Sequence, residues 1–379
     1  MKILHSLFVS AAVLAATPLL PGAPAASPKH YVCPSCGCAA DDRTFDKPGK
    51  CPECNMDLIE KVDHKQQPQQ STVGVLLFDG AEVIDYAGPW EVFGQAGFKV
   101  FTVAENSKPV DAVFGQKLIP DYTFENAPHM NILLVPGGGG SRKAMQNPAV
   151  LKWVQQAAQN SEHVMSVCTG SLILGKAGLL DGLSATTFHG ALDLLAKAAP
   201  KTRVVHDQRY VDNGKIITTA GLSSGIDGAL HLVSKMKSKG FAQATALTLE
   251  YQWDPQGKYA RAALADRYLP ETNELDGDFL SVDGDVDHWQ VEALLSKPDS
   301  PVAILDLLGK QVKDTPHAKG SVVVERADDP GPAHGGTLQW SFVSDDSRRW
   351  NGQAVVKPST EDPQKSLLSL KLNSESKPN

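Results

Sequence analysis

The sequence predicts an α/β protein with a doubly wound, mostly parallel sheet, preceded by a small cysteine-rich module and followed by an α+β extension. Short, continuous apolar runs are typical of parallel strands that are buried on both faces. Helical patterns alternate with these runs, as a doubly wound sheet requires. Two CxxC pairs stand ahead of the first run. With 379 residues, of which 42% are hydrophobic, the chain is long enough for two or three compact units.

The first residues have the pattern of a secretory signal peptide. Lys2 precedes an apolar run over residues 3–20, and residues 23–25 are small enough for cleavage. Pro18 interrupts the run before it reaches the roughly 20 residues of a membrane-spanning helix. We therefore expect a signal peptide over residues 1–25, a periplasmic or secreted protein, and no integral membrane segment after cleavage.

Residues 29–63 form the cysteine-rich module. Cys33 and Cys36 make one CxxC pair, and Cys51 and Cys54 make the other. Two tight turns that each present two thiolates can close a tetrahedral site, which suits zinc or Cu(I), and the ion would also hold the fold of so short a segment. Two disulfides are the alternative, because export implies an oxidising compartment. The CxxC spacing favours chelation, and it leaves Cys38 without an assigned part.

A polar linker over residues 64–71 leads into the central domain, residues 72–255. Its strands are expected over residues 72–78, 98–104 and 131–135, its helices over 88–97, 148–160, 190–199, 223–239 and 241–253, and a hairpin between 208–211 and 215–218.

The C-terminal part has a different character. We expect a short helix (259–269) and an acidic linker over residues 256–287, and then a small α+β extension over residues 288–373. The extension should contain a helix over residues 303–312 and strands over 321–325, 337–343, 353–357 and 366–372. None of its residues has the spacing of a catalytic or metal-binding motif, so its role stays unassigned.

Cys168 carries the strongest catalytic signal. It stands where the apolar strand 163–167 runs into a helix over 169–175, which is the form of a nucleophile elbow. The positive end of the helix dipole predicts a thiol pKa well below the ~8.5 of free cysteine. Backbone N–H groups of Gly138, Gly139 and Thr169 are candidates to stabilise charge on a substrate. The alternative is a buried, inert cysteine.

The central stretch resembles the ThiJ/PfpI superfamily, whose fold is flavodoxin-like and of the class I glutamine amidotransferase type. The motifs that carry the resemblance lie at residues 77–80, 84–93, 135–138, 167–170, 178–182, 185–187, 212–215, 219–221 and 225–233. They are most similar to the isonitrile-hydratase branch and to the ligand-sensing half of AraC-type regulators. The resemblance implies that Asp85 approaches Cys168, where a protonated carboxyl would donate a hydrogen bond to the thiolate. It also implies that the domain forms a homodimer.

Two departures limit what the resemblance implies. Thr169 replaces the histidine that follows the cysteine in PfpI-type peptidases, so a Cys-His dyad is unsupported. Where the family often has Ala-Thr-Thr-His-Trp, residues 185–189 of this chain read Ala-Thr-Thr-Phe-His, so the histidine stands one position later. His189 is therefore a candidate to reach the pocket, and the alternative is a surface or capping histidine.

Residues 31–58 resemble the heavy-metal-binding domain of copper and silver efflux proteins. That family has Met-His after its first Cys-Pro, where this chain has Ser35-Cys36. The difference favours a zinc-ribbon-like site over a copper-selective one.

Three functions follow from these features. The first is an exported enzyme of the isonitrile-hydratase or amidase-like kind, acting on a small-molecule substrate through Cys168 with no cofactor in the central site. The second is a redox or electrophile sensor without turnover, and the third is a metal-handling protein. A net charge of -7 and the absence of a long Lys/Arg run argue against nucleic acid as a partner. Export and the lack of a helix-turn-helix tail oppose an AraC-type regulator.

Overall fold

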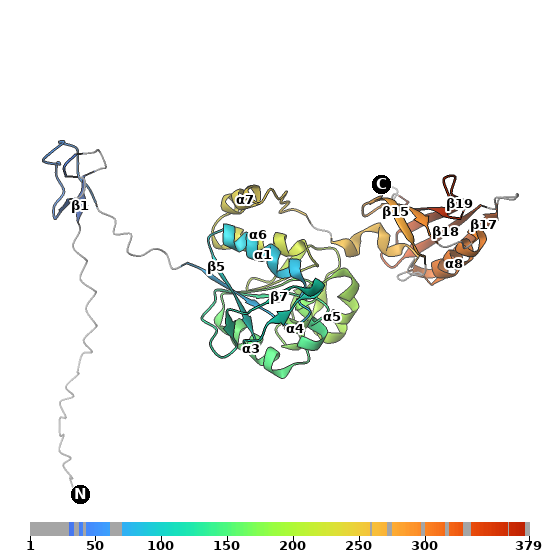
Figure 1. Cartoon of the computed structure of the whole chain (residues 1–379), viewed down its shortest axis with the longest axis horizontal. Coiled ribbons are helices and arrows are strands. Elements are labelled where there is room, and N and C mark those ends of the chain that lie inside the picture. Colours follow the sequence, from blue (N-terminus) through green and yellow to red (C-terminus); the bar gives the residue numbers. More distant parts are fainter. Residues whose placement is uncertain are drawn as a thin grey trace, which may run out of the picture. The chain divides into compact units, whose positions relative to one another are not determined.

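The computed structural model of the chain is shown in Figure 1. It describes residues 30–33, 38–40, 43–60, 70–257, 260–270, 275–296, 300–314, 318–328, 335–362 and 364–375. The signal peptide expected over residues 1–25 lies outside the described residues. The chain divides into two compact units, Met1–Gln69 and Gln70–Asn379. Among the helices that the structure describes, none is long and apolar enough to cross a membrane.

The N-terminal unit contains a small antiparallel sheet in the order β2-β1-β3. Its strands are β1 (Tyr31–Val32), β2 (Thr44–Phe45) and β3 (Ile59–Glu60). Among the described residues of this unit, Cys33, Ala40 and Cys51 are buried. So few buried groups cannot form a hydrophobic core of ordinary size, which is the condition under which small modules depend on a metal or on disulfides.

The central domain is built on a seven-stranded sheet in the order β13-β14-β10-β9-β4-β5-β8. Every neighbouring pair is parallel except β13 and β14, which form the expected hairpin. The strands are β4 (Thr72–Leu76), β5 (Lys99–Ala104), β8 (Tyr122–Thr123), β9 (Ile132–Val135), β10 (His163–Ser166), β13 (Tyr210–Asp212) and β14 (Ile216–Thr219). The doubly wound, mostly parallel sheet is confirmed.

Helices cover both faces of this sheet (Figure 1). On one face lie α1 (Val83–Gln95), α6 (Ser224–Met236) and α7 (Lys239–Thr248), and on the other α2 (Ser141–Ala144), α3 (Pro148–Asn160), α4 (Gly170–Lys176) and α5 (Leu192–Ala198). Two small pairs, β6 (Val110–Asp111) with β7 (Lys117–Leu118) and β11 (Ser184–Ala185) with β12 (Arg203–Val204), and the turns η1 (Val113–Gly115) and η2 (His189–Ala191), complete the domain.

One helix begins earlier than its sequence pattern predicts. The expected helix over residues 88–97 starts at Val83, and Pro89 lies inside it. Proline removes one backbone hydrogen bond from a helix, but Tyr86, Pro89 and Phe93 are all buried, so packing of this face on the sheet holds the helix together. The earlier start places Asp85 in the first turn of α1, above the carboxyl ends of the strands.

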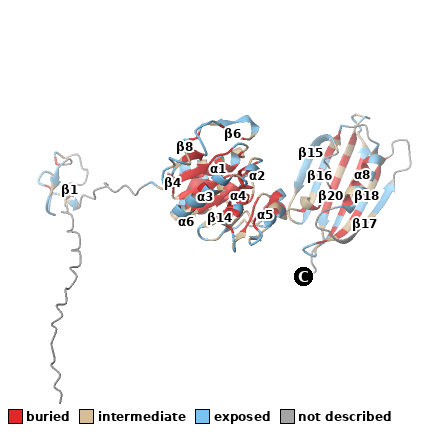
Figure 2. Cartoon of the chain, turned by 90° about the horizontal axis from the view of Figure 1, so that it is seen from below, coloured by how far each residue is buried: buried red, intermediate tan, exposed pale blue. Residues whose placement is uncertain are grey.

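The C-terminal part forms a six-stranded antiparallel sheet in the order β15-β16-β20-β19-β18-β17, with one helix, α8 (Pro301–Lys313). The strands are β15 (Gly277–Gly284), β16 (His288–Leu295), β17 (Ala318–Asp328), β18 (Gly336–Ser344), β19 (Arg349–Pro358) and β20 (Ser366–Ser374). Buried residues alternate with more exposed ones along β18, β19 and β20, which marks one face as the core side (Figure 2).

The boundary expected at residue 288 is wrong. The supposed acidic linker contains β15, and the helix expected over 259–269 is a pair of 3-10 turns, η3 (Arg261–Ala263) and η4 (Ala265–Tyr268). The ring of Tyr268 is fully buried and lies 4.8 Å, centroid to centroid, from that of Trp350. Because η4 belongs to the same hydrophobic core as the sheet, the C-terminal module already begins near residue 260.

Trp350 is the largest fully buried side chain of this core. Replacing it with Ala should lower the free energy of unfolding of the module by about 3–5 kcal/mol, because the cavity cannot collapse around a fixed sheet. Val323→Ala, at a side chain that is 55% exposed on β17, should change it by less than about 0.5 kcal/mol. Urea unfolding of the two variants measures the difference, and equal midpoints would contradict this assignment of the core.

Candidate functional sites

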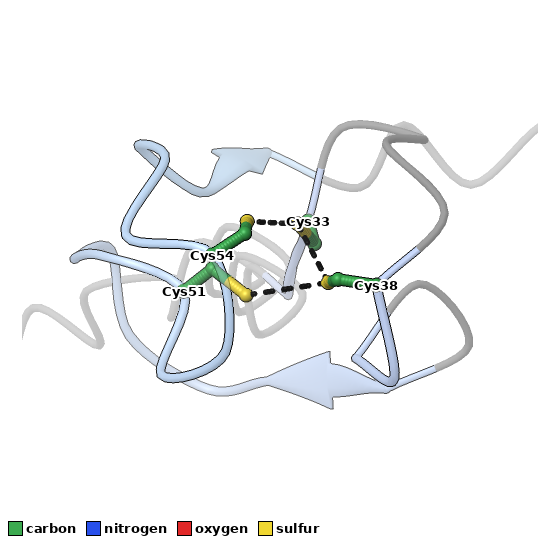
Figure 3. A group of neighbouring side chains, drawn as sticks. All are labelled: Cys33, Cys38, Cys51 and Cys54. Atoms are coloured by element: carbon green, nitrogen blue, oxygen red, sulfur yellow. Dashed lines mark hydrogen bonds between the residues drawn. The ribbon is translucent and has the colours of Figure 1, made fainter.

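Four thiols converge in the N-terminal unit (Figure 3). The Sγ atoms of Cys33, Cys38, Cys51 and Cys54 all lie within 4.8 Å of one another. Cys33 Sγ is 3.4 Å from Cys54 Sγ and 3.8 Å from Cys38 Sγ, which is in turn 3.8 Å from Cys51 Sγ. A tetrahedral site with Zn–S bonds of about 2.3 Å separates its sulfurs by about 3.8 Å. The four thiols therefore fit a single metal ion.

The same distances are too long for disulfides among these four described cysteines. An S–S bond is about 2.05 Å long, whereas the shortest of these Sγ–Sγ distances is 3.4 Å. Local folding explains their arrangement. The N–H of Cys51 donates to Met56 O at 2.8 Å, and that of Asn55, at a φ of 62°, donates to Cys51 O at 2.9 Å. This tight turn points Cys51 and Cys54 to the same side, and Cys33 directly follows β1.

Cys36, one of the four ligands expected from sequence, lies outside the described residues. Among the described residues, the fourth thiol of the cluster is that of Cys38, to which the spacing assigns no part. A CxxC spacing draws attention to Cys33 and Cys36, whereas Cys38 follows Cys33 by five positions and belongs to no such pair. Only the fold shows that its sulfur reaches both Cys33 and Cys51.

The second site surrounds Cys168, at the turn between β10 and α4. Cys168 has a φ of 55°, in the left-handed region that residues other than glycine rarely adopt. Its N–H donates to Ala220 O at 2.9 Å and fixes the turn. A Cβ atom at Gly170 would lie 2.1 Å from Val135 O, so only glycine allows α4 to start this close to β9. The predicted strand-to-helix elbow is present.

Asp85 lies against this elbow, as the resemblance implied. Its carboxyl is fully buried and lies close enough to the Cys168 thiol for each group to change the pKa of the other. Two backbone donors hold the carboxyl in place: the N–H of Gly137 donates to Oδ2 at 3.0 Å and that of Leu222 donates to Oδ1 at 3.2 Å. A Cβ atom at Gly137 would lie 2.5 Å from Thr169 N and 2.9 Å from Cys168 Cβ, so this approach requires glycine.

The expected depression of the thiol pKa is wrong. Burial raises the pKa of Cys168 to about 12, and the negative charge of Asp85 adds to this, against a smaller lowering by the Thr169 N–H. Burial likewise raises the pKa of Asp85 to about 7, although the N–H of Gly137 opposes it. At neutral pH the thiol therefore keeps its proton, and the carboxyl beside it can either accept or return one.

The glycine loop serves a different purpose from the one predicted. The N–H of Gly138 donates to Thr169 Oγ1 at 3.0 Å, so it is already engaged. The N–H of Thr169 lies next to the Cys168 sulfur and lowers the pKa of the thiol. The N–H of Gly139 has no partner among the hydrogen bonds of the described residues, and it stays a candidate donor. The loop mainly orients Asp85 and Thr169.

Ser141 is a site residue that the sequence analysis missed. Its buried Oγ lies 2.8 Å from Thr169 Oγ1 and 2.7 Å from Gly138 O, and thus locks the residue next to the nucleophile. Its place directly after the glycine run, at the start of α2, is the one signal that could have revealed it.

His189 lies apart from the hydrogen bonds of the Cys168–Asp85 pair. Its ring is 4.2 Å, centroid to centroid, from that of Phe188. Burial lowers its pKa, and the positive charge of Arg261 lowers it further. Among the described contacts, none joins His189 to Cys168 or Asp85, so a catalytic part for it has no structural support.

Comparison with known proteins agrees with this geometry. Isonitrile hydratase of Pseudomonas putida is 37% identical over 183 residues, which cover 47% of this chain and 78% of that protein. Residues 71–235 match the DJ-1/PfpI family. The chain belongs to the DJ-1/PfpI family. Outside the DJ-1/PfpI domain, residues 30–61 match the heavy metal binding domain.

The relatives of this chain in the DJ-1/PfpI family are not all named as enzymes. The HTH-type transcriptional regulator GbdR of Pseudomonas aeruginosa is 25% identical over 194 residues, or 49% of this chain and 52% of that regulator. Among solved structures, a THiJ/PfpI family protein from Pseudomonas syringae is 32% identical over 49% of this chain and 77% of its own, with a TM-score of 0.46. The family thus includes enzymes and regulators, and chemistry has to be argued from the site.

Proposed function

We propose that the DJ-1/PfpI domain adds water to the terminal carbon of an isonitrile and releases an N-substituted formamide. The observation that carries the proposal is the neighbouring pair of a protonated thiol, Cys168, and a buried carboxyl, Asp85, whose pKa is raised to about 7. The 37% sequence identity between this chain and an isonitrile hydratase supports the same chemistry.

The pair suits this reaction because an isonitrile, R–NC, accepts a nucleophile and a proton on the same carbon. Cys168 gives its proton to Asp85 as its sulfur bonds to that carbon, and Asp85 passes the proton to the carbon. The product is a thioimidate, R–N=CH–S–Cys168. A water molecule then adds to the carbon with a proton moving to nitrogen, and the C–S bond breaks as the sulfur regains a proton. The sum is R–NC + H₂O → R–NH–CHO.

The backbone donors around the site favour this reaction over amide hydrolysis. Thiol attack on an amide develops an oxyanion, which requires free N–H groups aimed at it. Here the N–H groups of Gly137 and Gly138 are taken by Asp85 and Thr169, so among the described hydrogen bonds of this loop only the N–H of Gly139 is left for an oxyanion. The first step on an isonitrile develops no oxyanion, so it does not depend on them.

The raised thiol pKa also weakens the sensor alternative. Oxidation to a sulfenic acid proceeds through the thiolate, and burial keeps Cys168 protonated. A metal-handling role for the N-terminal unit is compatible with the enzyme, because the two sites use different residues. For that unit we propose a structural zinc ion held by Cys33, Cys38, Cys51 and Cys54, which suits a closed set of four thiolates. We further propose that the chain is exported, on the pattern of its first 25 residues.

The test is turnover by the purified full chain with a panel of isonitriles, amides and aldehydes. We expect isonitriles to yield formamides and Cys168→Ala to lower kcat/KM by at least about 10³-fold, because the variant has no nucleophile. Cys38→Ser removes a thiol outside the domain and serves as the control that retains turnover. Turnover of amides alone, or equal rates in Cys168→Ala, would contradict the proposal.

A further inference from the structure

The segment between β14 and α6, residues 220–223, touches both members of the Cys168–Asp85 pair. The carbonyl of Ala220 accepts from the N–H of Cys168 at 2.9 Å, and the N–H of Leu222 donates to Asp85 Oδ1 at 3.2 Å. These two backbone groups belong to one short turn of the chain. The path of this segment therefore helps to fix how the carboxyl lies against the thiol.

Leu222 has a backbone conformation that is strained for leucine. Its φ is 56°, in the left-handed region where a Cβ atom crowds the backbone. Residues other than glycine keep such a conformation only where their surroundings hold it, and such residues gather at functional sites. The Leu222 side chain is 42% exposed, so its own packing contributes little. Contacts on either side of Leu222 must therefore hold the strained turn.

Arg209, directly before β13, contacts the segment on both sides of Leu222. Its carbonyl accepts from the N–H of Ala220 at 2.8 Å, and its Nη2 donates to Ser223 Oγ at 3.1 Å. The guanidinium is anchored on Asp227 in the first turn of α6, where its Nε donates to Oδ2 at 2.6 Å. The Asp227 side chain is only 5% exposed. One arginine thus ties the turn both to the hairpin and to a buried carboxylate.

The charge of Arg209 does not act on Asp85 directly. The titratable groups that change the pKa of Asp85 are Glu82, directly before α1, and Cys168. The N–H groups of Gly137 and Leu222 lower that pKa against the larger effect of burial. Since Arg209 is not among the described causes, an influence of Arg209 on the carboxyl has to pass through the turn that carries the Leu222 N–H.

We propose that Arg209 is a positioning residue of the isonitrile site, which rests on the function proposed above: it holds residues 220–223 so that the Leu222 N–H stays on Asp85. Without this hold the strained turn relaxes and the carboxylate loses one of its two backbone donors. Asp85 then takes up a proton at a higher pH and can no longer accept one from Cys168 there. Lysine cannot replace Arg209, because its single ammonium lacks the planar fork that reaches Ser223 and Asp227 together.

The pH dependence of kcat/KM for cyclohexyl isocyanide tests the proposal in the full chain. Arg209→Lys keeps a positive charge beside Asp227, and we expect it to move the acid limb of the profile to higher pH by about 0.5 pH unit, which is the effect of one lost hydrogen bond to a carboxylate. Turnover should fall by at least about twofold at pH 6.5 and recover by pH 8.5. Ser223→Ala, at an exposed side chain, should move the limb in the same direction.

Arg203→Lys and Ser184→Ala are the matched controls. Arg203 Nε donates to Ser184 Oγ at 3.1 Å between β12 and β11, so these variants break the same kind of hydrogen bond elsewhere in the domain. Among the described contacts, none joins Arg203 or Ser184 to Cys168 or Asp85. We expect both controls to keep the wild-type profile.

Alkylation of Cys168 by iodoacetamide separates this inference from the proposed function. The charge of Asp85 raises the pKa of the thiol, so the alkylation rate should change slope at the pH where Asp85 titrates, whether or not the protein hydrates isonitriles. We expect that pH to rise in Arg209→Lys and in Ser223→Ala. An unmoved or lower value in both variants, or an equal rise in Arg203→Lys, would overturn the proposal. Thermal melting shows whether Arg209→Lys folds, and if it does not, Ser223→Ala decides.

Discussion

Asp85→Asn should abolish turnover and at the same time make Cys168 easier to alkylate. An amide cannot accept the thiol proton, so we expect kcat to fall by about 10²–10⁴-fold. The charge of Asp85 and its hydrogen bond both raise the pKa of Cys168, so their removal lowers that pKa and increases the thiolate fraction. Iodoacetamide should therefore modify Cys168 several-fold faster at pH 8 in the variant, as peptide mass spectrometry can measure residue by residue.

The pH dependence of both effects follows from the raised pKa of Asp85, about 7. Above pH 7 the carboxyl is charged, so the variant should differ most from the wild-type protein in alkylation. Below pH 7 the wild-type carboxyl is protonated and the ratio of the two alkylation rates should fall towards one. Turnover by the wild-type enzyme should decrease as the pH drops through about 7, because a protonated Asp85 cannot accept the thiol proton.

Glu82→Gln is the matched control, since it makes the same carboxylate-to-amide change three residues earlier. The charge of Glu82 raises the pKa of Asp85. Among the described hydrogen bonds, none joins Glu82 to the thiol. We expect this variant to retain turnover, with its pH profile moved to lower pH. Slower alkylation in Asp85→Asn, or unchanged turnover, would show that the pair does not work as described.

Loss of Cys38 should remove the metal ion from the N-terminal unit. We expect about one zinc ion per wild-type chain by elemental analysis, and a loss of most of it in Cys38→Ser and in Cys51→Ser, because three thiolates leave the tetrahedral site open. The described part of this unit has only Ala40 buried besides its cysteines, so the metal-free variants should also be cut by protease within residues 30–60. A strong chelator should have the same effect on the wild-type protein.

Cys36→Ser is the comparison that decides between the two ligand sets. The sulfurs of Cys33, Cys38, Cys51 and Cys54 are already within 4.8 Å of one another, so Cys36→Ser should keep its zinc. If Cys36→Ser loses the ion while Cys38→Ser keeps it, the ligands are the two CxxC pairs, and the cluster with Cys38 is not the metal site.

The central fold and the catalytic pair could be predicted from sequence for identifiable reasons. Parallel strands buried on both faces leave continuous apolar runs, such as Ile132–Val135, where all four residues are buried. Cys168 stands between such a run and a helix, and the family resemblance supplied Asp85. The hydrogen bonds that place Asp85 join residues 52 and 137 positions apart, which no local pattern contains.

Three features depend on tertiary structure and were therefore mispredicted or missed. The helix dipole predicts a lowered thiol pKa, but burial of Cys168 raises that pKa and is the largest of its described causes. Strand β15 is an edge strand whose bulge breaks the alternation by which strands are recognised. Cys38 joins the metal cluster through the path of the chain rather than through motif spacing.

The central claim is that the sulfur of Cys168 bonds to the isonitrile carbon with Asp85 moving the proton, and intact-mass and peptide analysis tests it most directly. Protein mixed with cyclohexyl isocyanide and quenched in acid within one turnover should carry, on the Cys168 peptide, the added mass of one whole isonitrile molecule, as a thioimidate requires. Cys168→Ala should carry none. Formamide production with no adduct on Cys168, or with the adduct on another residue, would contradict the account.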